Sequence, residues 1–279
     1  MQMNTNFMRS MNETKTAFLF LLTVIFMASC GKVPTAEPNQ SFDHFIGDFE
    51  NGNLSGFHFL VVDTNVNTIM VNNPVRKGNH ALKNTLRPDN YIFNGYRAEL
   101  SVYNCAKYKT DVYYGFSVMI DTSYSDNQYN LVCQWQDLPN YLQGENWEPS
   151  PVLHGSPPPV QLTYVNGTFE LRMNDNPNSS NQTFLVGNAQ TISKGQWYDL
   201  VFHIYWCDDA AAFIEAWLNG NVFTPFNGTD NKYYKRNLYT RDGNYFKFGQ
   251  YRGKDQPLHT NVIYFDEIKV GSSYSEVAP

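Results

Sequence analysis

Short segments that alternate apolar and polar residues, separated by turn residues, restrict the fold of this chain more than any other feature. Asn166-Gly167, Asn219-Gly220 and Asp242-Gly243 are dipeptides of the kind that close β-hairpins. We find no helical period of useful length. The pattern predicts an all-β chain, a concanavalin-like two-sheet sandwich of the β-jelly-roll type. Strands are expected at 91–102, 112–121, 130–135, 160–164, 168–173, 197–206, 212–218, 245–251 and 262–270.

The composition agrees with this fold class. Hydrophobic residues make up 42% and aromatic residues 16% of the 279 residues, enough for a sizeable core. The 19 tyrosines and 20 phenylalanines favour strands over helices. The formal net charge of −6 argues against nucleic acid as a partner.

The N-terminus has the features of an export signal. Lys15 precedes an apolar run at 17–27 that is too short to span a bilayer as a mature helix. The small residues before Cys30 resemble a bacterial lipoprotein signal in which Cys30 carries the lipid, and a plain secretory signal is the alternative. We expect a periplasmic or cell-surface lipoprotein that touches the membrane through its lipid anchor only. Its parts would be a signal peptide at 1–30, a tether at 31–41 and one β domain at 42–279.

Three cysteines follow Cys30, namely Cys105, Cys133 and Cys207. An odd number in an exported protein leaves at least one thiol unpaired within the chain. Buried free thiols, or one disulfide and one thiol, are both open. The spacing of the cysteines matches no metal motif.

The segment 245–252 is expected to be a strand with two different faces. One face carries two phenols and an ammonium around a glycine, which would leave room for a ligand to approach the backbone. The other carries two phenylalanines and is expected to be packed. An ordinary strand with one solvated face is the alternative. The first face consists of Tyr245, Lys247, Gly249 and Tyr251, and the second of Phe246, Phe248, Gln250 and Arg252.

Two further segments carry polar side chains at alternate positions. Arg97 and Glu99 would point the same way from one strand, and Gln134 and Gln136 from another. Taken singly, the first pair fits a surface ion pair and the second a solvated strand. Three such faces in one all-β chain indicate a shared surface. We expect one concave sheet face lined by Arg97, Gln134, Gln136, Lys247 and Tyr251, with Trp135 and Phe246 beneath it.

In this order the three patterns resemble those of jelly-roll polysaccharide lyases. Alginate lyases of this fold carry similar strands along a concave cleft, and the heparin lyase I and glucuronan lyase group is more similar still. The resemblance covers residues 42–271. It rests on Arg97-Ala98-Glu99-Leu100, Gln134-Trp135-Gln136, Gly144-Glu145-Asn146-Trp147, Ser156-Pro157-Pro158, Tyr245-Phe246-Lys247-Phe248-Gly249-Gln250-Tyr251 and Tyr264-Phe265-Asp266-Glu267-Ile268.

The resemblance implies an enzyme that cleaves an anionic, uronic-acid polysaccharide by β-elimination. Such a lyase removes the C5 proton and expels the C4 oxygen. Donors aimed at the neighbouring carboxylate, here Arg97, Gln134 and Gln136, stabilise the enolate-like transition state. Tyr251 would transfer the proton, and Lys247, two positions along the same face, would supply the positive charge that favours its phenolate.

The remaining assignments surround this centre. Glu99 is expected to orient Arg97 rather than to transfer protons. No cofactor and no metal ligands are expected, although a structural calcium ion stays open, because no spacing of acidic residues identifies a calcium loop. The residues expected to contact substrate or support the site are Glu99, Tyr245, Arg252 and, in the proline-rich stretch 137–159, Glu145 and Trp147.

One position departs from the family pattern. Family members usually carry a histidine where this chain has Gln136, and that histidine helps to neutralise the substrate carboxylate or takes a proton. Gln136 can donate a hydrogen bond but does not titrate. His154, in the proline-rich stretch, is a candidate for the missing imidazole, and an exposed loop histidine is the alternative.

Two other functions stay open. A non-catalytic glycan-binding protein on the same fold is favoured if Gln136 marks lost activity. A glycoside hydrolase would need two carboxylates across the cleft, and the candidates Glu99, Glu145 and Glu148 lack the expected pattern.

Overall fold

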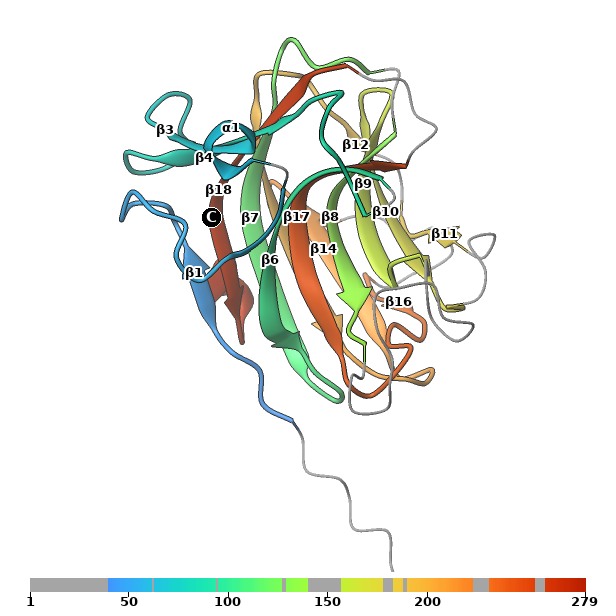
Figure 1. Cartoon of the computed structure of the whole chain (residues 1–279). Helices are drawn as coiled ribbons and strands as arrows, with labels where there is room; N and C mark the ends of the chain where they lie inside the picture. The colour runs from blue at the N-terminus through green and yellow to red at the C-terminus, as the bar shows by residue number, and fades with distance from the viewer. Residues whose placement is uncertain are drawn as a thin grey trace, which may run out of the picture. The chain divides into compact units, whose positions relative to one another are not determined.

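Two antiparallel nine-stranded sheets pack face to face, as the alternating pattern predicted (Figure 1). The computed structural model describes residues 40–61, 63–93, 95–126, 129–139, 157–177, 183–187, 190–222, 231–253 and 259–279. Residues 39–279 form one compact unit. No helix in these ranges is both long enough and apolar enough to cross a membrane.

The first sheet is built around the long central strands β7 and β18. Its order is β15 (Asn221–Val222), β14 (Phe213–Leu218), β13 (Trp197–Tyr205), β7 (Asp111–Ile120), β18 (Asn261–Gly271), β4 (Ala81–Leu86) and β3 (Thr68–Val71), with β1 (Phe45–Gly47) beside β18 and β16 (Tyr233–Tyr234) beside β14.

The second sheet is built around β6 and β17. Its order is β11 (Thr183–Leu185), β10 (Thr168–Asn174), β9 (Val160–Val165), β8 (Asn130–Asp137), β17 (Asn244–Gly253), β6 (Gly95–Ala106) and β2 (His58–Val61), with β12 (Gln190–Thr191) beside β10 and β5 (Tyr91–Ile92) beside β6.

Aromatic side chains from both sheets fill the interior. Trp135 and Phe246, predicted to lie beneath the polar face, are fully buried, with ring centroids 5.0 Å apart. The Trp135 ring also meets Phe202 of the first sheet at 5.2 Å. Replacing such a fully buried aromatic residue by alanine costs about 3–5 kcal/mol, so this contact joins the two sheets firmly.

Two one-turn helices, α1 (Thr64–Asn67) and α2 (Tyr274–Val277), were not predicted. The Asp63 side chain caps α1 by accepting a hydrogen bond from the backbone N–H of Asn65 at 2.9 Å. Helix α2 rests on β7, where a Cβ on Gly115 would lie 2.0 Å from the carbonyl oxygen of Val277. A helix of four residues is too short to produce the apolar period that sequence reasoning relies on.

Candidate functional site

The three predicted polar patterns meet on adjacent strands, because β17 lies between β6 and β8 (Figure 1). Tyr251 lies opposite Arg97 on one side. Lys247 and Tyr245 lie opposite Gln134 and Gln136 on the other. Successive residues of a strand face opposite sides of the sheet, and cross-strand partners face the same side. These polar residues therefore share one face, away from the aromatic interior.

The centre of the polar face is a single carboxylate, that of Glu99. It accepts hydrogen bonds from Nη1 of Arg97 at 3.1 Å and from Nε2 of Gln134. The ammonium of Lys247 lies 3.5 Å from the same carboxylate. Glu99, Gln134 and Lys247 are each at most 3% exposed. Glu99 therefore does more than orient Arg97, since it holds donors from three strands in one arrangement.

Lys247 is buried in this cluster, and its surroundings disfavour its charged form. Burial is the main cause that lowers the pKa of Lys247 to about 8. The Glu99 carboxylate opposes the shift, and the Arg97 guanidinium adds to it. The Lys247 ammonium therefore loses its proton under mildly alkaline conditions.

The cation beside Tyr251 is Arg97, which corrects the predicted role of Lys247. The guanidinium carbon of Arg97 lies 3.9 Å from the centroid of the Tyr251 ring. The Lys247 ammonium lies 5.5 Å from the ring centroid of Tyr245, the other tyrosine of the strand. Arg97, the cross-strand partner of Tyr251, therefore provides the positive charge beside the Tyr251 ring.

Tyr245 belongs to an aromatic row that crosses the same face. Its ring stacks on Tyr103, with centroids 4.9 Å apart and planes within 4°. The His58 ring of β2 meets Tyr103 edge to face at 4.7 Å. Tyr245 is 3% exposed, whereas Gln136, opposite it, is half-buried. The row links the polar face to the edge of the sheet.

Gly249 has a structural role that the sequence did not predict, because no other residue fits its backbone position. Its φ is +130°, and a Cβ there would lie 2.2 Å from the carbonyl oxygen of Ala98. The pairing of β17 with β8 also shifts register between Phe248 and Tyr251. The glycine is required by a bulge that brings β17 close to the backbone of β6.

Arg252 lies on the interior face, which decides between the two roles considered for it. It is 1% exposed, and its Nη1 donates to the carbonyl oxygen of His259 at 3.2 Å. Within the described ranges, its Nε and Nη2 meet no hydrogen-bond acceptor. Its guanidinium faces the Tyr124 ring, with the centroid at 5.8 Å. Arg252 is therefore a structural residue and not a substrate subsite.

Several predicted residues lie outside the described ranges, so their assignments stay predictions. They are Cys30, Glu145, Trp147 and His154.

Sequence reasoning missed two polar residues on neighbouring strands. Gln161 lies opposite Gln134, and Arg172 lies opposite Gln161. The signal was the alternation within 160–165 and 168–173. This alternation predicts strands, but by itself it also fits an ordinary solvated face and does not indicate a site.

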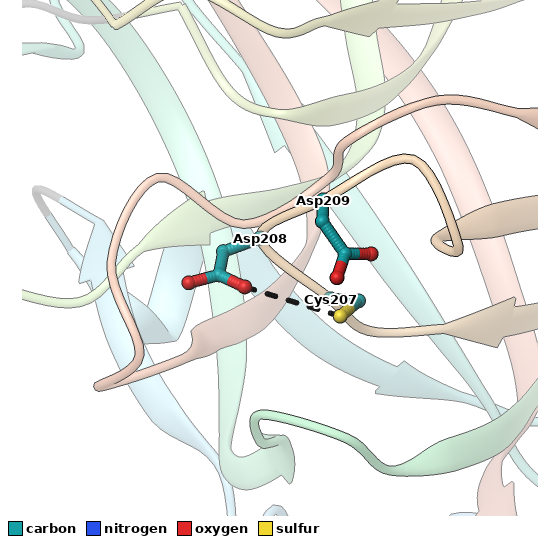
Figure 2. A group of neighbouring side chains, drawn as sticks. All are labelled: Cys207, Asp208 and Asp209. Carbon is teal, nitrogen blue, oxygen red and sulfur yellow. Dashed lines mark hydrogen bonds between the residues drawn. The ribbon is translucent and has the colours of Figure 1, made fainter.

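One cluster of potential metal ligands, Cys207, Asp208 and Asp209, lies in the part of the chain that the structure describes (Figure 2). Asp208 pairs with the guanidinium of Arg241 at 2.9 Å, and Asp209 accepts a hydrogen bond from the N–H of Ala211 at 2.8 Å. Burial, aided by Asp209, raises the pKa of the Cys207 thiol. Both carboxylates are thus engaged by neighbouring residues.

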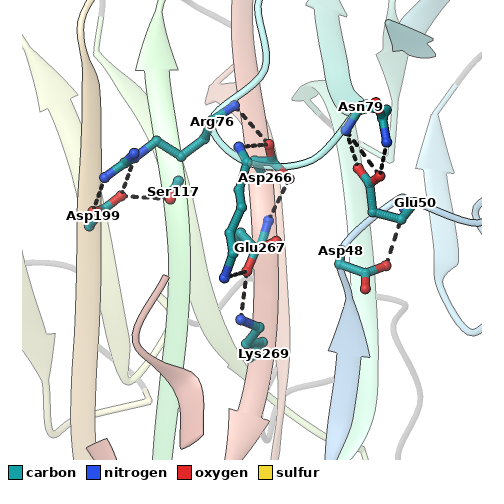
Figure 3. Close-up of polar contacts among 10 residues, drawn as sticks. Asp48, Glu50, Arg76, Asn79, Ser117, Asp199, Asp266, Glu267 and Lys269 are labelled. Carbon is teal, nitrogen blue, oxygen red and sulfur yellow. Dashed lines mark hydrogen bonds and ion pairs between the residues drawn. The ribbon is translucent and has the colours of Figure 1, made fainter. Parts of the chain in front are cut away.

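A second polar network lies on the first sheet (Figure 3). Arg76 donates from Nε and Nη2 to the Asp199 carboxylate at 2.9 and 2.7 Å. Asp266 accepts from the backbone N–H groups of Arg76 and Lys77 at 2.9 and 3.2 Å. Burial raises the pKa of Asp266 to about 6, although these backbone donors oppose the shift.

The same segment is held at its other end. Glu50 accepts a hydrogen bond from the backbone N–H of Asn79 at 2.8 Å (Figure 3). It also accepts one from the backbone N–H of His80 at 2.9 Å. Asp199, Asp266 and Glu50 thus all accept from residues 76–80, between β3 and β4. The network fastens a connection to the sheet, which is a structural task.

Solved structures of carbohydrate-active enzymes share this fold. An endo-β-1,4-glucuronan lyase from the fungus Trichoderma reesei aligns with a TM-score of 0.65 at 20% identity, over 86% of this chain and 99% of that chain. Alginate lyase A1-II′, of polysaccharide lyase family 7, aligns with a TM-score of 0.51 at 15% identity, over 78% and 94%. A glycoside hydrolase family 131 catalytic domain from Coprinopsis cinerea aligns at 0.51 and 12%, over 84% and 95%.

At these identities the likeness establishes the fold, which is the predicted jelly roll, and the same fold serves lyases and a hydrolase. No curated protein matches the sequence. The family model described as polysaccharide lyase matches residues 49–269, a span that contains β6, β8 and β17 with their polar face. The chain therefore belongs to the polysaccharide lyase family.

Proposed function

We propose that this protein cleaves a uronic-acid polysaccharide by β-elimination. The observation that carries the proposal is the convergence of Arg97, Gln134 and Lys247 on one buried carboxylate, with Arg97 also covering Tyr251. Fixed donors of this kind can neutralise a substrate carboxylate without reorganising during the reaction. Membership of the polysaccharide lyase family supports the same reaction class.

The proposed step needs one proton acceptor and several donors. Tyr251, as phenolate, takes the C5 proton, and the electron pair of that C–H bond forms the C4–C5 double bond. The C4–O bond breaks, and the departing oxygen receives a proton, which the Tyr251 phenol can return. Arg97, against the Tyr251 ring, supplies positive charge. Gln136 contributes hydrogen-bond donation alone, since an amide does not titrate.

The carboxylates of the described strands do not form the pair that a glycoside hydrolase needs. Glu99 and Glu170 are the carboxylates that the described strands β6, β17, β8, β9 and β10 carry on this face. Four strand spacings separate them by about 19 Å, whereas inverting glycosidases hold their pair about 6.5–9.5 Å apart. Both are also engaged by arginine, Glu99 by Arg97 and Glu170 by Arg172.

The test is a screen of glucuronan, alginate, heparin, heparan sulfate and ulvan for unsaturated products. We expect ultraviolet absorbance from an unsaturated uronide on at least one polymer. Tyr251→Phe removes the phenolic oxygen and keeps the ring against Arg97. It should lower kcat by about 10²–10⁴-fold while binding of the polymer is nearly unchanged.

Tyr245→Phe is the matched control, since it removes the same oxygen from the other tyrosine of β17. If Tyr245→Phe abolishes turnover and Tyr251→Phe does not, the proton-transfer assignment is wrong. Reducing ends without ultraviolet absorbance would indicate a hydrolase. Binding of the polymer without either product would indicate a glycan-binding protein.

A further inference from the structure

The polar face continues past the residues that resemble the family motifs. Lys247 pairs with Gln134, Gln134 with Gln161, and Gln161 with Arg172. These four residues are successive cross-strand partners, so they form one straight row over β17, β8, β9 and β10. Three strand spacings place Arg172 about 14 Å from Lys247.

The side chains of this row point to the same side of the sheet. Leu162, Leu171 and Met173 belong to the buried core. Because successive residues of a strand face opposite sides, Gln161 and Arg172 point away from that core, as Gln134 does. Gln161 is 5% exposed, while the Arg172 side chain keeps 32% of its surface accessible.

Arg172 is held in a fixed orientation. Its Nε and Nη2 donate to Oε2 of Glu170 at 3.1 and 2.5 Å. Among the described residues, nothing accepts a hydrogen bond from its Nη1. A guanidinium anchored on one side by a carboxylate can bind a second carboxylate with its remaining donors.

Tyr129 is a phenol close enough to Arg172 for the guanidinium charge to act on it. Burial raises the pKa of Tyr129 to about 12, and the charge of Arg172 opposes that shift. Gln161, the cross-strand partner of Arg172, also influences the pKa of Tyr129.

We propose that Arg172, with Gln161, forms a distal subsite that binds a carboxylate of a uronic-acid chain, on a different sugar unit from the one that reacts. The inference rests on the proposed function. Its chemistry is the pairing of a planar guanidinium with a carboxylate, and Glu170 positions the guanidinium for it.

The test compares Arg172→Gln with the wild-type full-length chain, using glucuronan and its size-fractionated oligosaccharides. KM for the polymer should rise about ten-fold or more, because the variant loses a charged hydrogen bond, and kcat should stay unchanged. Short oligosaccharides that cannot reach from the reaction centre to β10 should show wild-type KM. Arg172→Lys, which keeps the charge but not the planar fork, should recover part of the affinity.

Arg76→Gln is the matched control, because Arg76 also makes a two-point contact with a carboxylate, on the other sheet. It should leave KM unchanged for all chain lengths. An unchanged KM in Arg172→Gln, or an equal rise for short and long chains, would overturn the subsite. If the wild type releases no unsaturated product, the Kd for glucuronan replaces KM. Weaker binding in Arg172→Gln then upholds the subsite while the lyase function fails, and equal binding overturns both.

Discussion

Lys247 limits the pH range over which the site keeps its charges. Its pKa of about 8 lies well below the usual lysine value of 10.5, chiefly because the side chain is buried. A lowered lysine pKa means that the ammonium is present below about pH 8 and is lost as the pH rises through that value. Above it, Glu99 keeps Arg97 as its cationic partner but loses Lys247.

We expect kcat/KM for a uronic-acid polymer to fall as the pH rises through about 8, since this parameter reports the ionisation of the free enzyme. A bound carboxylate favours the ammonium, so the corresponding fall in kcat should lie at higher pH. Lys247→Arg keeps the charge at all these pH values and should lose the alkaline fall. The pH profile of unsaturated-product formation measures both effects, and an unchanged alkaline limb in Lys247→Arg would assign it to another group.

For single residues, the sequence predicted which face of its strand each polar side chain occupies. It did not predict that the Glu99 carboxylate is their shared hydrogen-bond acceptor. The contacts of Glu99 with Gln134 and Lys247 join residues 35 and 148 positions apart. They depend on strand order and register, which alternation within one strand does not contain. For the same reason, the sequence predicted Lys247 rather than Arg97 as the cation beside Tyr251.

Among the elements, β17 depends on a single backbone position. Gly249→Ala should destabilise the protein by at least about 1–3 kcal/mol, the usual cost of a strained backbone conformation. The reasons are the φ of +130° and the contact with the Ala98 carbonyl oxygen. Because Glu99 is the cross-strand partner of Gly249, activity should fall with stability.

Urea unfolding monitored by tryptophan fluorescence measures this effect. Gly253→Ala is the matched control in the same strand, since a Cβ at Gly253 meets nothing within 4 Å. It should unfold within about 0.5 kcal/mol of the wild type. Equal midpoints for the two variants would show that the bulge does not require glycine.

Strands were predictable where local pattern and burial agree. The expected strand at 245–251 appears as Asn244–Gly253, and that at 168–173 as Thr168–Asn174. The expected strand at 91–102 is divided into β5 and β6, and β6 continues to Ala106. Strand ends depend on pairing with neighbours, so a pattern within one segment places them less well than the strand itself.

In the whole molecule, the two sheets share one interior but carry different surfaces. The second sheet holds the Glu99 cluster and the row that ends at Arg172, whereas the first holds the network that fastens residues 76–80. Solved structures of lyases and a hydrolase share this fold. The fold therefore does not decide the chemistry, and the proposed lyase function rests on the polar face and not on the sandwich.

The same interior decides the state of the cysteines, which the sequence left open. Cys105, Cys133 and Cys207 are free and at most 1% exposed. Burial raises the pKa of Cys105 to about 12, and it raises that of Cys133 further. The domain is thus held together by its packed core and not by disulfides among these residues.

We therefore expect the thermal midpoint to be the same with and without dithiothreitol. A thiol reagent such as Ellman's reagent should react with none of the three cysteines in the native protein, because they are buried and protonated. All three should react after unfolding in guanidinium chloride. The measurement uses a Cys30→Ser chain, so that the Cys30 thiol does not add to the number of reactive thiols. A midpoint lowered by reductant, or fewer than three thiols in the unfolded chain, would show that a disulfide forms in the protein and that the packed core alone does not account for its stability.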